Sequence, residues 1–594
     1  MRIERTLGLL GIVAFATLAA CADENASSLR GGGAGGEGPP GNPGGGGGVN
    51  EAPLGEESDL ALPRLTREEY VATLSDLLRE TMPSSANELV TSATKSALVM
   101  PEDQLVSPPL ERHGGFARLD QSQQQKYVDV PFQIAAQLGK AMTSTPARTG
   151  ELVGACSKAG TSIDRACLES FVRRFGELAL RRTLAADDVA FYVGASPPTN
   201  VSTELVATTV TQMLSSPRFL YHVESGTETA GGADIFALDA WELAARLSYH
   251  FWGTMPDAKL REAAKSGALL TAAGYAAEVD RLFADPRTET TFESFFTQWF
   301  WPLLELPALD SRLGDDTFKA FAGPNAPSGE LRAKMVREVV QAATFVARNG
   351  GKVRDMLTNR QSFARDAELA AIYGVPAWNG VGIPPELPAE RVGLLTRPAF
   401  LTTGTANTRP VMKGVFIRTT LLCDEVPPPP QDGMNVAINL SPTSSTRQVV
   451  EQITESNPAC AGCHKSMINP LGFASEGFDA LGRVRKTQTL FDTTGKVVGQ
   501  ANIDTSGIPA IRGNDTRVAS GIGQVTEWLA ESGRVEDCFA ERYFRFTFRR
   551  IESTSGDRAL VEVFAKAARD GRSLSDVMKA TALRPEFKRR RILP

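Results

Sequence analysis

Apolar residues recur at helical spacing along most of the chain. Thr66 and Glu69 form a capping box before a run of apolar positions three and four apart, which predicts an amphipathic helix. Asp239 and Glu242 form a second capping box at the start of another helix. Further helical patterns cover residues 171–182, 203–215, 331–348, 447–455, 525–529, 538–549, 558–570 and 574–583. Alternating strand patterns are rare and short, so we predict a mainly α protein with a multi-helical body.

One predicted helix carries an aromatic stripe, formed by Phe292, Phe295, Phe296 and Trp299. A helix with one wide apolar face normally packs that face into the protein interior. We therefore interpret the stripe as buried core and not as the wall of a cofactor site.

The helical pattern weakens between about residue 352 and residue 445. Proline-rich pieces such as 383–385 and 427–430 predict extended, irregular connections in this region. Beyond the helix at 447–455, the polar stretch 487–506 is compatible with a small hairpin.

The N-terminal residues have the pattern of an export signal. Arg2 and Arg5 precede an apolar run from Leu7 to Ala20, which is too short to cross a membrane as a helix. The tetrapeptide that ends at Cys21 resembles a bacterial lipoprotein box, which implies cleavage before Cys21 and attachment of lipid to it. An ordinary secretory signal with an incidental cysteine is the alternative. No aspartate follows Cys21 directly, so we expect an outer-membrane lipoprotein that faces the periplasm or the cell surface.

The net charge of the chain limits its partners. The 594 residues carry a net charge of −6, whereas general nucleic-acid binding needs a basic surface. Phosphate-binding and dinucleotide-binding glycine fingerprints are absent from the sequence. We expect no nucleic-acid partner.

Cys460, Cys463 and His464, here called the haem motif, form the Cys-x-x-Cys-His signature of covalent haem attachment. Two thiols at this spacing can form thioethers with the two vinyl groups of one porphyrin, and the next residue can offer the iron its proximal nitrogen. Covalent attachment takes place outside the cytoplasmic membrane, so the export signal and the motif support each other. We predict one covalent haem c with His464 as the proximal ligand.

Three other interpretations of the motif remain open. The two thiols could form a small disulfide, they could bind zinc together with His464, or the match could be chance. Zinc needs a fourth ligand, and the chain has no second Cys-x-x-Cys and no His-x-x-x-His.

Four of the seven cysteines lie outside the lipid and haem assignments. They are Cys156, Cys167, Cys423 and Cys538, and an oxidising compartment permits them two disulfides. Four cysteines allow three connectivities. We favour Cys156 with Cys167 as the local pair, which leaves Cys423 with Cys538 as a long-range tie.

The sequence does not identify the distal side of the iron. Small cytochromes c place a methionine downstream of the motif, but only Met467 and Met578 follow it here, and Met467 points to the same side as His464 on a helix. An open, five-coordinate iron is one alternative. Upstream candidates for a distal ligand, each of which also has an ordinary packing explanation, are Met412, Met434, His222 and His250. Candidate cations for the haem propionates are Arg409, Arg418, Arg483 and Arg485.

The stretch 460–483 resembles the cytochrome c domain of a planctomycete-type multidomain family. In that family Cys-x-x-Cys-His is followed by Pro-Leu/Ile-Gly-Phe and Phe-Asp-x-x-Gly, which stand here at 470–473 and 478–482. Blocks similar to its companion domains, the PSD and PSCyt types of unknown function, are 65–78, 171–184, 216–221, 247–257, 391–414, 427–430 and 538–550. The resemblance implies a large exported c-type cytochrome without a known reaction. Asn469 and His250 depart from the family, which usually has Asp and an apolar residue there.

The chain is divided into predicted segments by composition and pattern. The boundaries are 1–21 for the lipoprotein signal peptide and lipobox, 22–60 for a disordered Gly/Pro-rich linker, 61–150 for an N-terminal helical domain, 151–230 for a helical domain with a local disulfide, 231–360 for a central helical domain, 361–500 for a cytochrome c-like haem-binding domain and 501–594 for a C-terminal helical domain.

We therefore expect a lipid-anchored monohaem c-type cytochrome that transfers electrons at the cell envelope to a redox partner protein that the sequence does not identify. One alternative is a haem-dependent oxidoreductase whose open iron acts on peroxide, oxygen or an extracellular polymer. The other is a non-redox envelope surface-binding protein. The sequence leaves open whether the chain is an enzyme.

Overall fold

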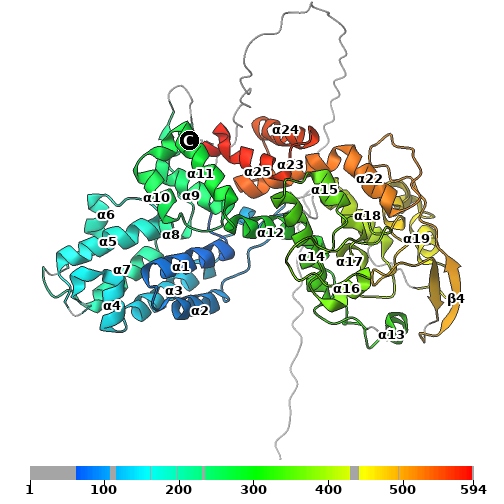
Figure 1. Ribbon diagram of the computed structural model, residues 1–594, viewed down its shortest axis with the longest axis horizontal. Helices are drawn as coiled ribbons and strands as arrows, with labels where there is room; N and C mark the ends of the chain where they lie inside the picture. Colours follow the sequence, from blue (N-terminus) through cyan, green and yellow to red (C-terminus); the bar gives the residue numbers. More distant parts are fainter. Residues whose placement is uncertain are drawn as a thin grey trace, which may run out of the picture. The chain divides into compact units, whose positions relative to one another are not determined.

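The computed structural model describes residues 62–107, 115–158, 160, 162–196, 198–229, 234–324, 326–427, 440–492 and 494–591. The described chain is mainly helical with few strands, as predicted (Figure 1). Among the described residues, no helix is long and apolar enough to cross a membrane. The predicted signal peptide with Cys21, the predicted linker at 22–60 and Met434 lie outside the described residues. The described residues all belong to one compact unit.

The first eight α-helices share one hydrophobic core. The predicted capping box is confirmed: the Glu69 N–H donates to Thr66 Oγ1 at 3.1 Å, and the Thr66 N–H donates to the Glu69 carboxylate at 3.2 Å. Four apolar side chains of this first helix are buried in the core: Tyr70, Leu74, Leu77 and Leu78. These helices are α1 (Arg67–Thr81), α2 (Ala86–Ala97), α3 (Lys126–Met142), α4 (Pro146–Val153), α5 (Arg165–Leu180), α6 (Ala186–Val193), α7 (Thr203–Leu214) and α8 (Pro217–Leu220).

A second core joins the middle of the chain to its C-terminal part. The Tyr275 hydroxyl donates to the carbonyl of Ala582 at 2.9 Å, which ties α11 to α25 (Figure 1). The capping box at Asp239 and Glu242 is present as predicted and begins α9. The helices are α9 (Ala240–Phe251), α10 (Ala258–Lys265), α11 (Ala272–Ala284) and α25 (Leu574–Leu583).

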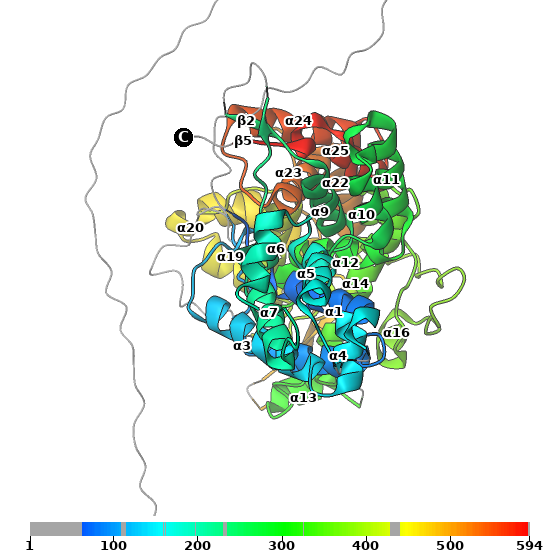
Figure 2. The ribbon, with the colours of Figure 1, turned by 90° about the vertical axis from the view of Figure 1, so that its left-hand side faces the viewer.

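A small antiparallel sheet, which the sequence did not predict, joins the same two parts of the chain. Its order is β1-β2-β5, and Figure 2 shows β2 beside β5. Each strand has only two or three residues, so no alternation could reveal it. The strands are β1 (Thr227–Glu228), β2 (Ile235–Ala237) and β5 (Arg589–Arg591).

The largest core takes residues from Phe116 to Met578 and contains the predicted aromatic stripe. Phe295 and Trp299 of α12 are fully buried, and the Trp299 indole N–H donates to the carbonyl of Thr420 at 2.7 Å. Helices around this core and the haem motif are α12 (Arg287–Trp299), α13 (Asp316–Ala322), α14 (Leu331–Arg348), α15 (Val353–Thr358), α16 (Ala367–Tyr373), α17 (Pro398–Leu401), α18 (Pro410–Phe416), α19 (Thr446–Thr454), α20 (Pro458–Cys463), α21 (Asn469–Phe473), α22 (Ile522–Ser532), α23 (Arg534–Phe548) and α24 (Ser555–Arg569).

Single helical turns complete the described chain. Two of them are π-helical, η6 (Ile417–Leu421) and η8 (His464–Ile468). The others are 3₁₀ turns: η1 (Ala117–Leu119), η2 (Ala155–Ser157), η3 (Ala268–Leu270), η4 (Trp301–Leu303), η5 (Leu394–Thr396) and η9 (Pro585–Lys588).

Residues 352–445 are more helical than predicted, because α15 to α18 and η6 lie within them. Each of these elements has at most seven residues, too few to show a helical period. Pro398 and Pro410 occupy first helical positions, where proline favours a helix start. The predicted hairpin is confirmed as β3 (Thr487–Phe491) paired with β4 (Val497–Asn502).

A buried carboxylate joins the first core to the C-terminal helices. Glu69 accepts hydrogen bonds from Arg549 at 2.5 and 3.1 Å, and His222 Nε2 lies 3.4 Å from the same carboxylate. Burial alone would raise the pKa of Glu69, but Arg549 and the other partners hold it well below its usual value. Burial and the charge of Arg549 lower the pKa of His222 to about 4.

A second buried ion pair lies between α14 and the start of α17. Glu338 and Arg397 are in direct contact, and each side chain is 1% exposed. The Tyr373 hydroxyl donates to Glu338 Oε2 at 2.9 Å, and the Phe363 N–H donates to Oε1 at 3.1 Å. Every charge in this pair therefore has partners, which is the condition for burying it without a large penalty.

Replacing Arg397 by Met should destabilise the protein by about 3–5 kcal/mol, because the Glu338 carboxylate would stay buried without its counter-charge. Urea denaturation of the purified protein measures this change. The exposed pair Lys566–Asp570 provides the control, since Lys566→Ala should cost less than about 1 kcal/mol. Equal midpoints for the two variants would contradict the assignment.

Stability should fall as the pH decreases from 6.5 toward 4. The unfolded chain protonates His222 near pH 6.5, whereas the folded chain resists protonation down to about pH 4, so the lower pH favours the unfolded state. The loss from this residue amounts to roughly 3 kcal/mol over the whole interval. Unfolding free energies at pH 7, 6 and 5 test this, because His222→Gln should have a shallower pH dependence; identical slopes would refute it.

Candidate functional site

The local sequence explains why the two motif cysteines lie on one helical turn. Asn457 caps α20, since its side-chain oxygen accepts from the Ala459 N–H at 3.0 Å, and Pro458 takes the first helical position. Cys460 and Cys463 are three residues apart on this helix and therefore share a face. Both thiols are free and half-buried (α20 is labelled in Figure 2).

The other four described cysteines are paired. Cys156 bonds Cys167 with a Cα–Cα separation of 5.5 Å, and Cys423 bonds Cys538 with a separation of 5.3 Å. This is the connectivity that we favoured from the sequence.

His464 begins the π-helical turn η8, and a proline accounts for the widened turn. Pro470 has no N–H, and its ring would clash with the carbonyl four residues earlier in a regular helix. The backbone instead forms a bond one residue longer, in which the Asn469 N–H donates to the carbonyl of His464. Asn469 is consequently placed beside the imidazole ring.

The Asn469 side chain orients the imidazole. Its Oδ1 lies 3.2 Å from His464 Nδ1, and its Nδ2 donates to Glu455 Oε1 at 2.9 Å and to Thr454 Oγ1 at 3.0 Å. The Thr454 hydroxyl uses its own proton on the carbonyl of Val450, so it accepts from the amide. Both amide protons are therefore used, and Oδ1 can only accept. His464 carries its proton on Nδ1, which leaves the Nε2 lone pair for a metal.

The segment after His464 packs backbone to backbone on α18. An ideal Cβ at Gly414 would lie 2.1 Å from the carbonyl oxygen of Ile468, and one at Gly472 would lie 2.0 Å from that of Pro410. Only glycine permits this approach at both positions. These two glycines, one in each segment, therefore fix η8 and α21 against α18.

Arg418 connects the two π-helical turns. The guanidinium is buried; its Nε donates to the carbonyl of Met467 at 3.0 Å, and its remaining nitrogens bind Asp424 at 3.1 Å and the carbonyl of Pro509 at 2.8 Å. These bonds hold the end of η8 to η6. Arg418 is thus engaged in the protein's own structure.

Of the other three candidate propionate cations, two are also engaged within the protein and one is not. Arg483 pairs with Asp479 at 2.6 Å, and Arg485 pairs with Glu476 at 2.8 Å. Within the described ranges no hydrogen bond or ion pair holds the guanidinium of Arg409, which is half-buried at the start of α18. Arg409 is therefore the member of the set with a side chain left for a ligand.

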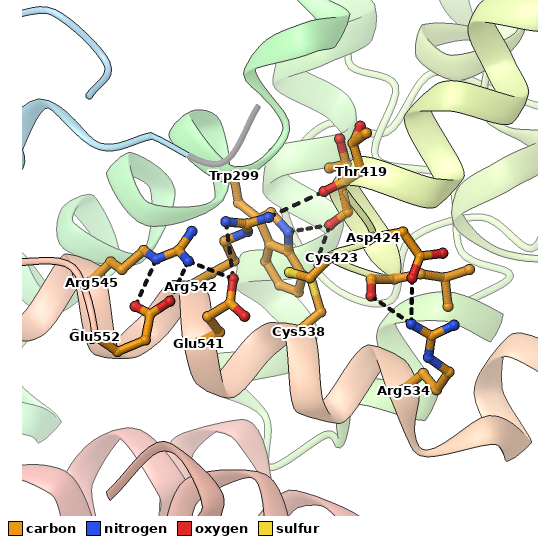
Figure 3. The surroundings of a disulfide bond; sticks show 12 residues. Trp299, Thr419, Cys423, Asp424, Arg534, Cys538, Glu541, Arg542, Arg545 and Glu552 are labelled. Carbon is orange, nitrogen blue, oxygen red and sulfur yellow. Dashed lines mark hydrogen bonds and ion pairs between the residues drawn. A yellow bond between two sulfur atoms is a disulfide. The ribbon is translucent and has the colours of Figure 1, made fainter. Parts of the chain in front are cut away.

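The disulfide Cys423–Cys538 secures η6 to α23 (Figure 3). Around it, the Trp299 indole and Arg542 donate to the carbonyls of Thr420 and Thr419, at 2.7 and 3.2 Å. Through η6 and Arg418, the largest core thus supports the turn that carries His464.

A buried lysine lies on α18 beside the motif segment. Lys413 is 4% exposed, and among the described residues its Nζ has no hydrogen-bond partner. Burial lowers the pKa of this amine to about 8, although the carboxylates of Glu476 and Asp479 act in the opposite direction. The sequence does not distinguish Lys413 from an exposed lysine, because no local pattern indicates its burial.

The candidate distal ligands lie in different surroundings. Met412 is 48% exposed and belongs to α18, the helix that packs on η8. His250 is buried in α9, where Nε2 lies 3.1 Å from the Tyr543 hydroxyl and the ring packs on Phe251 and Phe587. Burial, with the charge of nearby arginines, holds the pKa of His250 well below its usual value.

The residues of the motif fit a covalently bound haem. Two free thiols share one face of α20, and the following imidazole has its Nδ1 held and its Nε2 lone pair available. Val449 and Ile453, four residues apart on α19, are half-buried apolar side chains of the segment that leads into the motif. Within the described ranges, no group of three or more His, Cys, Asp or Glu side chains is placed to hold a metal ion.

Sequence reasoning missed the residues that support the motif. Asn469 was noted only as a departure from the resembled family, and Arg418 was considered for a ligand's carboxylate. The signal for Asn469 is its position five residues after the histidine and directly before a proline, which is where a π-helical turn brings the side chain back.

Two protein-family models match the chain. PSD4, a protein of unknown function (DUF1592), matches residues 238–375, and PSCyt3, a protein of unknown function (DUF1588), matches residues 391–488, which include the haem motif. No curated protein and no solved structure matches the chain. The chain therefore contains a PSD4 domain and a PSCyt3 domain, which are planctomycete-type families, the second of them cytochrome-like.

Proposed function

We propose that this protein is an exported monohaem c-type cytochrome that transfers electrons at the cell envelope. The observation that carries the proposal is the arrangement of two free thiols on one turn of α20, followed directly by an imidazole whose Nδ1 is held by Asn469. The PSCyt3 match over the same residues supports it.

The two thiols would hold the haem. The sulfur of each cysteine bonds one carbon of a vinyl group, and the thiol hydrogen passes to the other carbon, so the addition consumes no oxidant. His464 Nε2 would be the proximal ligand. When bound, the haem supplies a one-electron couple between ferric and ferrous iron.

The side chains around the motif would each contribute differently to haem binding. Asn469 keeps the imidazole in the tautomer with a free Nε2, and the half-buried Val449 and Ile453 would cover part of the porphyrin. Arg409 would pair with a propionate. Met412 would close the iron from α18, the helix that packs on the His464 turn, and a six-coordinate iron favours electron transfer over substrate binding.

The proposed location rests on the N-terminal signal and on the cysteines. Cys21 would carry the lipid anchor, and an oxidising compartment would preserve both disulfides, Cys156–Cys167 and Cys423–Cys538. The redox partner would be a protein that approaches the half-exposed motif.

Expression in a host that matures c-type cytochromes should give one covalent haem per chain. The double variant Cys460→Ala with Cys463→Ala should lose the c-type α band of the pyridine haemochrome spectrum, because no thioether can form. Replacing Cys156 and Cys167 by Ala is the matched control and should leave the band unchanged. A wild-type protein without this band would refute the proposal.

The ferric protein should be low-spin, and Met412→Ala should convert it to a high-spin form. The ferric variant should then bind cyanide, and the reduced variant should bind carbon monoxide. Met467→Ala is the control, since Met467 lies on the same turn as His464 and should leave the sixth position filled. A wild-type spectrum that is already high-spin would favour an open iron and would contradict electron transfer by a closed site.

A further inference from the structure

The acceptor of the His464 N–H is a neutral amide with a carboxylate behind it. Asn469 is fully buried, and the Glu455 carboxylate accepts from Asn469 Nδ2 at 2.9 Å. The three groups form one line of hydrogen bonds, from the imidazole through the amide to the carboxylate. No side chain other than Asn469 is recorded as a hydrogen-bond partner of His464 within the described residues.

The acceptor strength at Nδ1 decides how strongly Nε2 donates electrons. A histidine that gives its N–H to a stronger acceptor becomes a more basic ligand, and a more basic ligand stabilises the ferric state. A carboxylate on the far side of the amide polarises it and strengthens its oxygen as an acceptor. The charge of Glu455 therefore increases the basicity of His464 through the Asn469 amide, without direct contact between Glu455 and His464.

We propose that Asn469 and Glu455 are positioning residues that set the reduction potential of the iron, with the amide transmitting the charge of Glu455 to His464. This inference rests on the proposed function, because it needs His464 as the proximal ligand. It concerns the ligand's electronics, whereas the attachment of the haem depends on Cys460 and Cys463.

The structure also explains why the charge lies at position 455 and not at position 469. An aspartate at 469 would bring a second carboxylate against Glu455 at the distance of a hydrogen bond, and like charges at this distance repel. The asparagine avoids the repulsion and satisfies Thr454 as well, at 3.0 Å.

Two variants test the effect of this charge: one removes it, and the other places it next to His464. Glu455→Gln removes it but keeps an oxygen for Asn469, and should raise the reduction potential. At the wild-type midpoint potential we expect the ratio of ferrous to ferric protein to be about threefold higher, a shift of about 30 mV from the one-electron relation of 59 mV per tenfold. The double variant Asn469→Asp with Glu455→Gln places the carboxylate directly on His464 and should lower the potential below that of the wild type.

Glu451→Gln is the matched control. It removes a carboxylate one turn earlier on α19, where Glu451 pairs with Arg447 at 2.7 Å, and should leave the potential unchanged. Potentials are measured by spectroscopic redox titration, and haem content is measured separately on each variant by pyridine haemochrome.

The outcomes separate the two proposals. If every variant carries haem and the potentials of wild type, Glu455→Gln and the double variant agree, the role of Asn469 and Glu455 is refuted while the haem assignment stands. A shift from Glu451→Gln as large as that from Glu455→Gln would also refute it. A wild-type chain without haem refutes the proposed function and this inference together.

Discussion

The approach of α18 to α21 is the constraint on which the candidate site depends. Gly414 and Gly472 each face a carbonyl oxygen of the other segment at a distance that no side chain tolerates, so the two backbones are in direct contact. This contact fixes the turn that carries His464 against α18. Met412 and Lys413 lie on α18, and Arg409 directly precedes its first residue. His464, the proposed proximal ligand, is thereby held in place by contacts of the protein itself.

A hierarchy of contacts supports this arrangement. The Cys423–Cys538 disulfide and Trp299 hold η6 to the largest core, Arg418 holds η6 to the end of η8, and Asn469 holds the imidazole within η8. The site thus rests on a short series of bonds that begins in a rigid interior. Such support is what a redox ligand needs, because small movements of the ligand alter the iron's electronic state.

The sequence predicted those features that a period or a spacing can reveal. Long helices such as 331–348, the capping boxes at Thr66 and Asp239, and the burial of the stripe around Phe295 follow from local pattern, and the structure contains all of them. The motif at Cys460 was evident from its spacing. The helices between residues 353 and 421 and the sheet β1-β2-β5 were missed, since elements of two to seven residues are too short to have a period.

The supporting residues of the site could not be predicted, because their roles depend on contacts between distant parts of the chain or on an irregular turn. Arg418 is surrounded by partners from η8 and from residues 509–510, and no local pattern places them together. Asn469 reaches His464 only because Pro470 widens the helix by one residue.

Mass spectrometry of the peptide that contains residues 457–469 tests the central claim most directly. Protein from a host that matures c-type cytochromes should yield this peptide with the added mass of one haem, and the addition should survive reduction and denaturation because both links are thioethers. An unmodified peptide, or one whose only change is reversed by a thiol reductant, would contradict the assignment of Cys460, Cys463 and His464 as a haem site.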